Sequence, residues 1–113
     1  MEKQIFAQQK MNDNEYHVLV TLAIEPLYGY RICKEVEKKT QGRKKISLAT
    51  LYDTLHRLAR QGLIEENGYQ QSEGGIRRTY RITDTGRQLL REEYSMRDIL
   101  QSMNRPSIMG VET

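Results

Sequence analysis

Two observations on the middle of the chain predict a mainly α fold with a small antiparallel β-ribbon. Residues 47–60 repeat leucine at helical spacing, and residues 63–82 follow at once as two strand-like segments around a glycine-rich turn. Residues 1–42 and 82–113 carry net charges of 0 and −1, whereas residues 43–81 carry eight Lys or Arg against four Asp or Glu. A helix followed by a basic ribbon is the order of a winged helix-turn-helix, which puts a helix in the DNA major groove and a basic loop on the backbone beside it.

Length and composition limit the function classes. A chain of 113 residues has room for one modest core, and a second catalytic domain does not fit. No apolar run approaches the roughly 20 residues that span a bilayer, and the N-terminus does not resemble a signal peptide, so we expect a cytoplasmic protein with no membrane partner. Cys33 is the only cysteine, which excludes an intramolecular disulfide and a cysteine-rich metal cluster. We expect it to be a small buried residue, with a redox role left open.

Two helices precede the leucine repeat. Asn12 with Glu15 three residues on predicts a capping box, and Tyr16, Leu19, Val20, Ala23 and Ile24 give the following helix an apolar face up to Ile24. Pro26 ends this helix. A second helix is expected from about Tyr28 to Lys39, with Ile32, Cys33 and Val36 directed inward and Gly42 as its C-terminal breaker.

The third helix, about Ser47–Arg60, is the predicted recognition helix. Ser47 is its expected N-cap, and Leu48, Leu51, Leu55 and Leu58 share one arc of the helix. Short hydroxyls and arginine occupy the opposite arc, where they suit base edges and phosphates but also suit an ordinary solvent face. Members of this polar arc are Thr50, Asp53, Thr54, Arg57 and Arg60.

The predicted ribbon consists of strands at Leu63–Tyr69 and Arg77–Ile82 around a turn at Ser72–Gly75. In the second strand, Tyr80 and Ile82 are expected to pack while Thr79 and Arg81 meet solvent. Asn67-Gly68 is itself a strong hairpin dipeptide, so a shorter hairpin there is the alternative.

A final helix is expected to start after a Thr83 cap and to run to about Asn104. Its apolar side chains fall in two sectors, which suggests two partners: Leu90 would join its own domain, and a stripe would meet a second subunit, covered in part by Ile5 and Phe6. The alternative is that the helix folds back on its own core. The expected organisation is an N-terminal arm or helix (1–11), a winged-helix domain (12–83), a dimerisation helix (84–104) and a flexible tail (105–113). The dimerisation stripe comprises Leu89, Met96, Ile99, Leu100 and Met103.

Three ordered stretches, LYGYRICKEVEKKTQG, SLATLYDTLHRLARQGLIE and SEGGIRRTYRITDTGRQLL, resemble the PadR family of bacterial winged-helix transcriptional regulators, and of these the short subfamily with one C-terminal helix. The resemblance covers about Leu19 to Leu90. It implies a homodimer, DNA contacts by Tyr52 and the first turn of the third helix, and wing contacts by Arg77 and Arg78. Tyr52 also suits a half-buried packing role, and Asp53 stands where many relatives carry Pro.

The expected function is a sequence-specific DNA-binding regulator, a repressor that binds a near-palindromic operator as a homodimer. Its predicted DNA contacts are Tyr28, Lys44, Lys45, Ser47, Thr50, Tyr52, Thr54, Arg57, Arg77 and Arg78. Family members commonly respond to small, often aromatic compounds, so an effector pocket is conceivable at the dimer interface, lined by Phe6, Tyr94, Met96 and Met103.

The sequence offers few alternatives to DNA binding. His17 and His56 are the only histidines and lack metal-ligand spacing, no nucleophile has a neighbouring base, and no phosphate loop is present. We therefore expect no enzyme, no metal and no cofactor. A protein of another class with the same pattern would be a winged-helix interaction module whose basic helix and ribbon bind an acidic protein.

Overall fold

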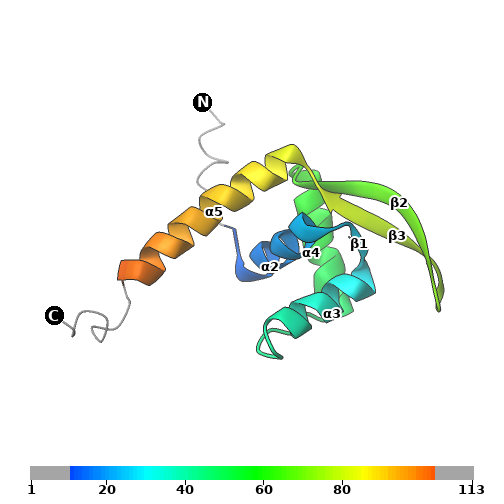
Figure 1. Cartoon of the computed structure of the whole chain (residues 1–113). Helices are drawn as coiled ribbons and strands as arrows, with labels where there is room; N and C mark the ends of the chain where they lie inside the picture. Colours follow the sequence, from blue (N-terminus) through cyan, green and yellow to red (C-terminus); the bar gives the residue numbers. More distant parts are fainter. Residues whose placement is uncertain (1–10, 104–113) are drawn as a thin grey trace.

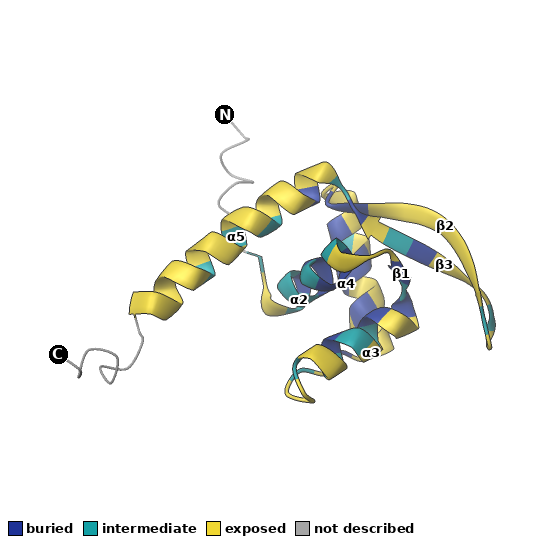
Figure 2. Ribbon diagram, viewed as in Figure 1, coloured by how far each residue is buried: buried dark blue, intermediate teal, exposed yellow. Residues whose placement is uncertain are grey.

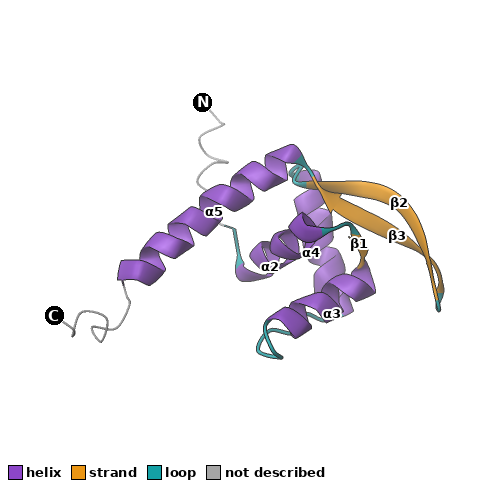
Figure 3. Cartoon of the chain, in the orientation of Figure 1, coloured by secondary structure: helices purple, strands orange, loops and turns teal. Residues whose placement is uncertain are grey.

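The computed structural model describes residues 11–103 and confirms a mainly helical winged helix-turn-helix with a small antiparallel sheet and a long last helix (Figure 1). Neither the predicted N-terminal arm, with Ile5 and Phe6, nor the tail after residue 103 lies in this part. Figure 3 shows the helices and strands of the chain. They are α2 (Asp13–Ile24), β1 (Leu27–Tyr28), α3 (Gly29–Lys39), α4 (Leu48–Arg60), β2 (Ile64–Ser72), β3 (Gly75–Ile82) and α5 (Asp84–Met103).

Local side-chain caps set the helix starts, as predicted. The Asn12 side chain accepts from the Glu15 backbone N–H at 2.8 Å, and the Glu15 carboxylate accepts from the Asn12 N–H at 2.9 Å, which completes the capping box of α2. Ser47 accepts from the Thr50 N–H at 3.1 Å at the start of α4. Thr83 accepts from the Gly86 N–H at 3.0 Å at the start of α5, and its hydroxyl also donates to the Gly62 carbonyl at 2.7 Å. Thr83 thereby ties the first turn of α5 to the end of α4.

The end of α3 is a Schellman motif. The Gly42 N–H donates to the Glu37 carbonyl at 2.8 Å, and the Gln41 N–H donates to the Lys38 carbonyl at 3.1 Å. Gln41 and Gly42 both have positive φ, at 55° and 81°. Gly42 therefore helps to end α3, as predicted, but the left-handed conformation begins one residue earlier, at Gln41.

The core forms where α2, α3 and α4 meet the base of the sheet. Ile32 and Val36 of α3 are buried as predicted, whereas Cys33 is only partly buried. In α2 the predicted inward face was partly wrong: Val18 and Leu22 are buried beside Leu19, and Ile24 is exposed. The reason is that α2 is apolar on two sides, because it contacts both the α3–α4 pair and α5. The core comprises Val18, Leu19, Leu22, Leu27, Ile32, Val36, Ile46, Leu51, Leu55, Leu58, Leu63, Ile64 and Ile82.

The sheet has three strands in the order β1-β3-β2, one more than the predicted ribbon. Leu27 pairs with Tyr80 and Tyr28 pairs with Thr79, so α3 starts at Gly29 rather than at Tyr28. This pairing also explains why Thr79, predicted to meet solvent, is buried while Tyr80 is only partly buried. Two residues after Pro26 are too short a segment to be recognised as a strand from sequence.

The turn at Ser72–Gly75 was predicted correctly, and Asn67-Gly68 does not form the alternative hairpin. The β2–β3 register instead shifts between Glu66 and Tyr69, with Gly68 at φ 89°, which is a β-bulge. The Thr79 hydroxyl lies 3.0 Å from the Asn67 carbonyl oxygen and 3.3 Å from that of Gly68. The bulge lets both strands run past this point into a longer ribbon.

Helix α5 and the β2–β3 ribbon project from the helical core in different directions (Figure 1). Leu90 packs against the core, as expected, but Gly86 is the only buried residue of α5. Most of the helix is exposed along its length (Figure 2). Helix α5 contacts α2, but its predicted stripe is not covered by the core of its own chain.

Gly86 is the residue that allows α5 to start so close to the end of α4. A Cβ on Gly86 would collide with the Leu63 carbonyl oxygen and would lie 2.8 Å from Cγ1 of Ile82. We expect Gly86→Ala to lower the free energy of unfolding by about 1–3 kcal/mol, because overpacking outweighs the gain in helix propensity. Thermal or urea unfolding measures this change. The matched control is Gln88→Ala on the exposed side of the same helix, which should change stability by less than about 0.5 kcal/mol; equal stability of the two variants would contradict the packing role.

Candidate nucleic-acid interface

The leucines of α4 determine which of its side chains face outward. Leu51, Leu55 and Leu58 are buried against α2 and α3, so the side chains on the opposite surface of the helix are exposed. Leu48, predicted on the buried arc, is instead exposed at the first turn. The exposed residues of α4 are Leu48, Ala49, Thr50, Tyr52, Asp53, His56, Ala59 and Arg60.

Thr54 was predicted to contact DNA, and this prediction was wrong because the residue is fully buried. On a helix, Thr54 lies only about 40° from Leu58 and about 60° from Leu51, so it belongs to the leucine side. Its hydroxyl donates to the Thr50 carbonyl at 2.9 Å, which satisfies the polar group within the helix. The sequence analysis placed Thr54 on the polar side of the helix. Its burial was missed because the hydroxyl bonds within its own helix and needs no other partner in the core.

Arg57 is held by two carboxylates. Its Nη1 donates to Asp53 at 2.8 Å and its Nε lies 3.4 Å from Oε2 of Glu15, a residue that is itself buried. The guanidinium thus links α4 to the first turn of α2. In this arrangement Arg57 positions α4 and neutralises Asp53, and it is not directed at a partner.

Ion pairs with carboxylates neutralise much of the basic excess that residues 43–81 have in the sequence. Lys44, Lys45, Arg57, Arg78 and Arg81 all lie in ion pairs with carboxylates. Within residues 11–103 no ion pair involves the other three basic residues of this segment, which are Arg43, Arg60 and Arg77. These three side chains are the strongest candidates for phosphate.

Tyr52 has the half-buried packing role that the sequence left open as one alternative. The side chain is half exposed, and its ring and hydroxyl pass directly over Gly29 at the start of α3. A Cβ on Gly29 would lie 2.6 Å from the Tyr52 hydroxyl oxygen, so a larger residue there would displace the end of the Tyr52 side chain. The Tyr28-Gly29-Tyr30 step therefore serves to seat Tyr52 between α3 and the ribbon.

A groove of about 460 Å³ lies between the start of α4 and the ribbon, and tyrosines line most of it. Five of the seven tyrosines of the chain contribute. Burial raises the pKa of Tyr80, so its phenol is protonated at neutral pH and can donate a hydrogen bond. We name this feature the tyrosine groove; its lining comprises Tyr28, Tyr30, Leu48, Tyr52, Tyr69, Ile76, Arg77, Arg78 and Tyr80.

Sequence reasoning found four residues of the tyrosine groove, Tyr28, Tyr52, Arg77 and Arg78, and missed the remainder. The overlooked tyrosines come from α3, β2 and β3, which are separated in sequence. The available signal was compositional: seven tyrosines against one phenylalanine and no tryptophan. A preference for phenol over plain aromatic rings indicates surfaces that are wet at one edge.

A second cavity, of about 440 Å³, lies where α5 crosses α2. Tyr94 lines it, but Met96 and Met103 do not, since they lie about half a turn around α5 from Tyr94. The predicted effector pocket is therefore not formed by these side chains within one chain, and its fourth member, Phe6, is outside the described residues. The cavity is lined by Tyr16, Val20, Ala23, Leu90, Arg91, Tyr94 and Ser95.

The dimerisation stripe predicted on α5 is exposed in the single chain. Leu89, Met96, Ile99, Leu100 and Met103 each expose more than a third of their surface. Large apolar side chains gathered along one helix indicate an interface with a partner.

Other chemistry finds little support in residues 11–103. No group of three or more His, Cys, Asp or Glu there could hold a metal ion, and no helix there is long and apolar enough to cross a membrane. Burial raises the pKa of the Cys33 thiol, which disfavours the reactive thiolate.

The chain is similar to known regulators in sequence and in fold. The transcriptional regulator PadR-like family matches residues 18–92. A PadR family transcription regulator from Clostridium difficile R20291 has a TM-score of 0.68 and 28% identity, with 83% of this chain and 97% of that chain covered. Bacillus subtilis PadR, solved in complex with operator DNA, shares the fold with a TM-score of 0.64 and 21% identity, over 85% of this chain and 62% of that chain.

A protein from Lysinibacillus sphaericus, named Uncharacterized protein X, is 40% identical over 65 residues, which is 58% of this chain and 60% of that protein. The chain thus spans less than two thirds of the length of this relative. The family match runs from α2 to the middle of α5 and includes the whole candidate interface. It confirms the resemblance and the prediction of a regulator rather than an enzyme: the chain belongs to the PadR-like family of transcriptional regulators.

Proposed function

We propose that this regulator binds operator DNA sequence-specifically through α4 and the β2–β3 ribbon, as a homodimer held by α5, and represses transcription by occupying its site. The observation that carries this proposal is the position of the tyrosine groove. It joins the exposed first half of α4 to the basic ribbon in one surface. The Bacillus subtilis PadR that was solved with operator DNA has the same fold.

In this binding mode, the exposed side of α4 faces the major groove. Ser47 and Thr50 lie at its first turn, where their hydroxyls are 3.1 Å apart, and Tyr52 stands beside them. Ala49, Asp53 and His56 replace Thr54 as side chains that can reach base edges. Asp53 would accept from a cytosine amino group, and its pairing with Arg57 reduces its repulsion of phosphate.

One sugar-phosphate strand would then cross the tyrosine groove. Phenol hydroxyls can donate to phosphate oxygens while the rings pack against deoxyribose, and Arg77 and Arg78 supply positive charge at the ribbon side. Tyr28 and Tyr52 keep the roles predicted for them. Lys45 is well exposed near the start of α4 and can reach the same strand, because its ion pair with Glu37 is long, at 4.0 Å.

The dimer brings two such surfaces onto one operator. An exposed apolar stripe on α5 fits a self-complementary interface, and twofold symmetry requires a near-palindromic site with half-sites about one helical turn apart. The α2–α5 cavity lies on the same helix. Its volume falls within the range of small-molecule pockets, so it is a candidate site for an apolar effector that alters the dimer.

A DNA interface makes binding strongly dependent on salt and on the unpaired arginines. We expect Arg77→Ala to weaken binding to a mixed-sequence 30-bp duplex and to lower the slope of log affinity against log salt by about 0.9, the value for one lost phosphate contact. Fluorescence anisotropy between 50 and 200 mM salt measures both quantities. Arg91→Ala on α5 is the charge-matched control and should leave the slope unchanged.

The same titration separates DNA binding from the alternative, an interaction module for an acidic protein. If the unmodified protein does not bind duplex DNA at 50 mM salt, the proposed function is wrong. Retention by an acidic protein column that duplex DNA fails to displace would then favour the alternative.

The tyrosine groove predicts a contact that depends on a hydroxyl. Tyr69 exposes 68% of its surface, so Tyr69→Phe should fold normally and weaken duplex binding about two- to tenfold by loss of one hydrogen bond. Tyr94→Phe is the matched control, because Tyr94 is similarly exposed on α5. Equal affinities of the Tyr69→Phe and Tyr94→Phe variants would contradict a DNA sugar-phosphate strand in the tyrosine groove.

The α5 stripe predicts that a charge in its middle separates the subunits. We expect Leu100→Asp to raise the dimer dissociation constant by about tenfold or more, because an unpaired carboxylate would be buried in the interface. Sedimentation velocity at tens of micromolar protein measures the change, with Gln101→Asp on another side of α5 as the control. A monomeric unmodified protein at that concentration would contradict the dimer.

A further inference from the structure

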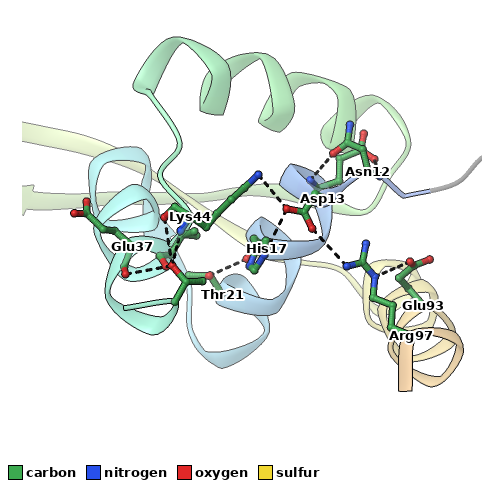
Figure 4. Close-up of polar contacts among 11 residues, drawn as sticks. Asn12, Asp13, His17, Thr21, Glu37, Lys44, Glu93 and Arg97 are labelled. Carbon is green, nitrogen blue, oxygen red and sulfur yellow. Dashed lines mark hydrogen bonds and ion pairs between the residues drawn. The ribbon is translucent and has the colours of Figure 1, made fainter. Parts of the chain in front are cut away.

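Asp13, the first residue of α2, contacts basic side chains from both of the regions that the proposed function uses. Its Oδ2 lies 3.0 Å from Nζ of Lys44, in the loop before α4, and its Oδ1 lies 3.5 Å from Nη1 of Arg97 on α5. Nε2 of His17 is 3.8 Å from the same Oδ2. Figure 4 shows the Asp13 side chain between Lys44 on one side and Arg97 on the other.

The Lys44 contact affects the loop that leads into α4. The Lys44 backbone N–H donates to the Thr40 hydroxyl at 3.0 Å, three residues before the Ser47 cap. Its side chain points back to α2 and is 26% exposed, whereas the side chain of the next residue, Lys45, is 71% exposed. Lys44 therefore cannot reach a phosphate without leaving Asp13.

The Arg97 contact affects the seat of α5. The Arg97 guanidinium lies 3.8 Å from the ring centroid of Tyr16, and its Nε donates to Glu93 at 2.8 Å. Tyr16 also lines the cavity between α2 and α5. A shift of α5 on α2 would move Arg97 relative to Asp13.

Two cations on one carboxylate repel each other, so the presence of each weakens the net hold on the other. The pKa of Asp13 is lowered, with Lys44 as the largest cause and Arg97 as a smaller one, so the carboxylate is ionised at neutral pH. Removal of one cation removes this repulsion, and the other cation is then held more firmly. The contacts of Asp13 are thus linked by charge even though Lys44 and Arg97 are on different elements.

We propose that Asp13 is a positioning residue that couples DNA binding to the packing of α5 on α2. Its ion pair keeps Lys44 away from phosphate, and the strength of that ion pair depends on whether Arg97 also contacts Asp13. This inference rests on the proposed function. When DNA takes Lys44, Asp13 holds Arg97 more firmly and α5 is seated more stably. By reciprocity, a ligand or subunit that draws Arg97 away from Asp13 tightens the hold on Lys44 and weakens DNA binding.

The size of the effect follows from exposure. The side chains of Asp13, Lys44 and Arg97 are partly exposed, and pairs of this kind change an equilibrium by up to about fivefold. An effect of that size is measurable in a cycle of variants, and the cycle isolates the coupling from the general effect of changing charge.

The experiment measures affinity for a mixed-sequence 30-bp duplex at 50 mM salt. Asp13→Asn should raise affinity about two- to fivefold more than Glu25→Gln, which removes the same charge from the other end of α2. This excess should disappear in a Lys44→Met background and persist with Lys44→Arg. Thermal unfolding identifies any loss of stability caused by the missing charge at the helix start.

The second arm starts from α5, and its first comparison uses no Asp13 variant. Arg97→Gln should lower affinity about two- to fivefold more than Arg91→Gln, and in the Asp13→Asn background the two should have equal effects. An Asp13→Asn excess that survives Lys44→Met, or equal effects of the two arginine variants in the unmodified protein, would overturn the coupling. Absence of duplex binding by the unmodified protein would instead overturn the proposed function, and the coupling with it.

Discussion

The burial of one leucine row on α4 is the constraint on which the candidate interface depends. Because Leu51, Leu55 and Leu58 occupy the contact with α2 and α3, helical geometry leaves no choice about which side chains face outward. The Arg57 bridge to Glu15 and the seat of Tyr52 on Gly29 fix the same helix from its two flanks. A helix locked on three sides is a rigid platform, which sequence-specific recognition requires.

Features that depend on neighbours in sequence were predictable. The caps at Asn12, Ser47 and Thr83 each satisfy a backbone N–H within three residues, so the starts of α2, α4 and α5 and the wing turn agreed with the prediction. Long-range partners were not visible in the same way. The β1–β3 pairing buried Thr79. The Asn67-Gly68 dipeptide, of a kind that normally closes a hairpin, lies in a β-bulge instead. The burial of Thr54 depended on a hydroxyl that could bond back to its own helix.

Charge is where a linear count fails most clearly. Residues 43–81 have an excess of four positive charges, yet most of their basic side chains are already paired with carboxylates, several from outside the segment. Asp13 and Glu15 belong to α2, and no sequence pattern joins them to Lys44 and Arg57. A count along the chain locates the basic region correctly, but it does not separate the unpaired Arg43, Arg60 and Arg77 from the basic residues that are held in ion pairs.

The small number of unpaired basic side chains in residues 43–81 bears on the role of the proposed second subunit. Affinity for DNA rises with the number of phosphates that basic groups neutralise, and the three basic side chains of residues 43–81 that lie in no ion pair give one chain a weak hold. Duplication by symmetry doubles that number without adding any residue, because the two surfaces bind one duplex as linked sites. Helix α5 leaves its apolar stripe uncovered at a distance from α4, so an interface there leaves both recognition helices accessible. In the proposed dimer, the length of α5 and the ion pairing of the basic segment are complementary, because binding strength would come from dimerisation more than from local charge.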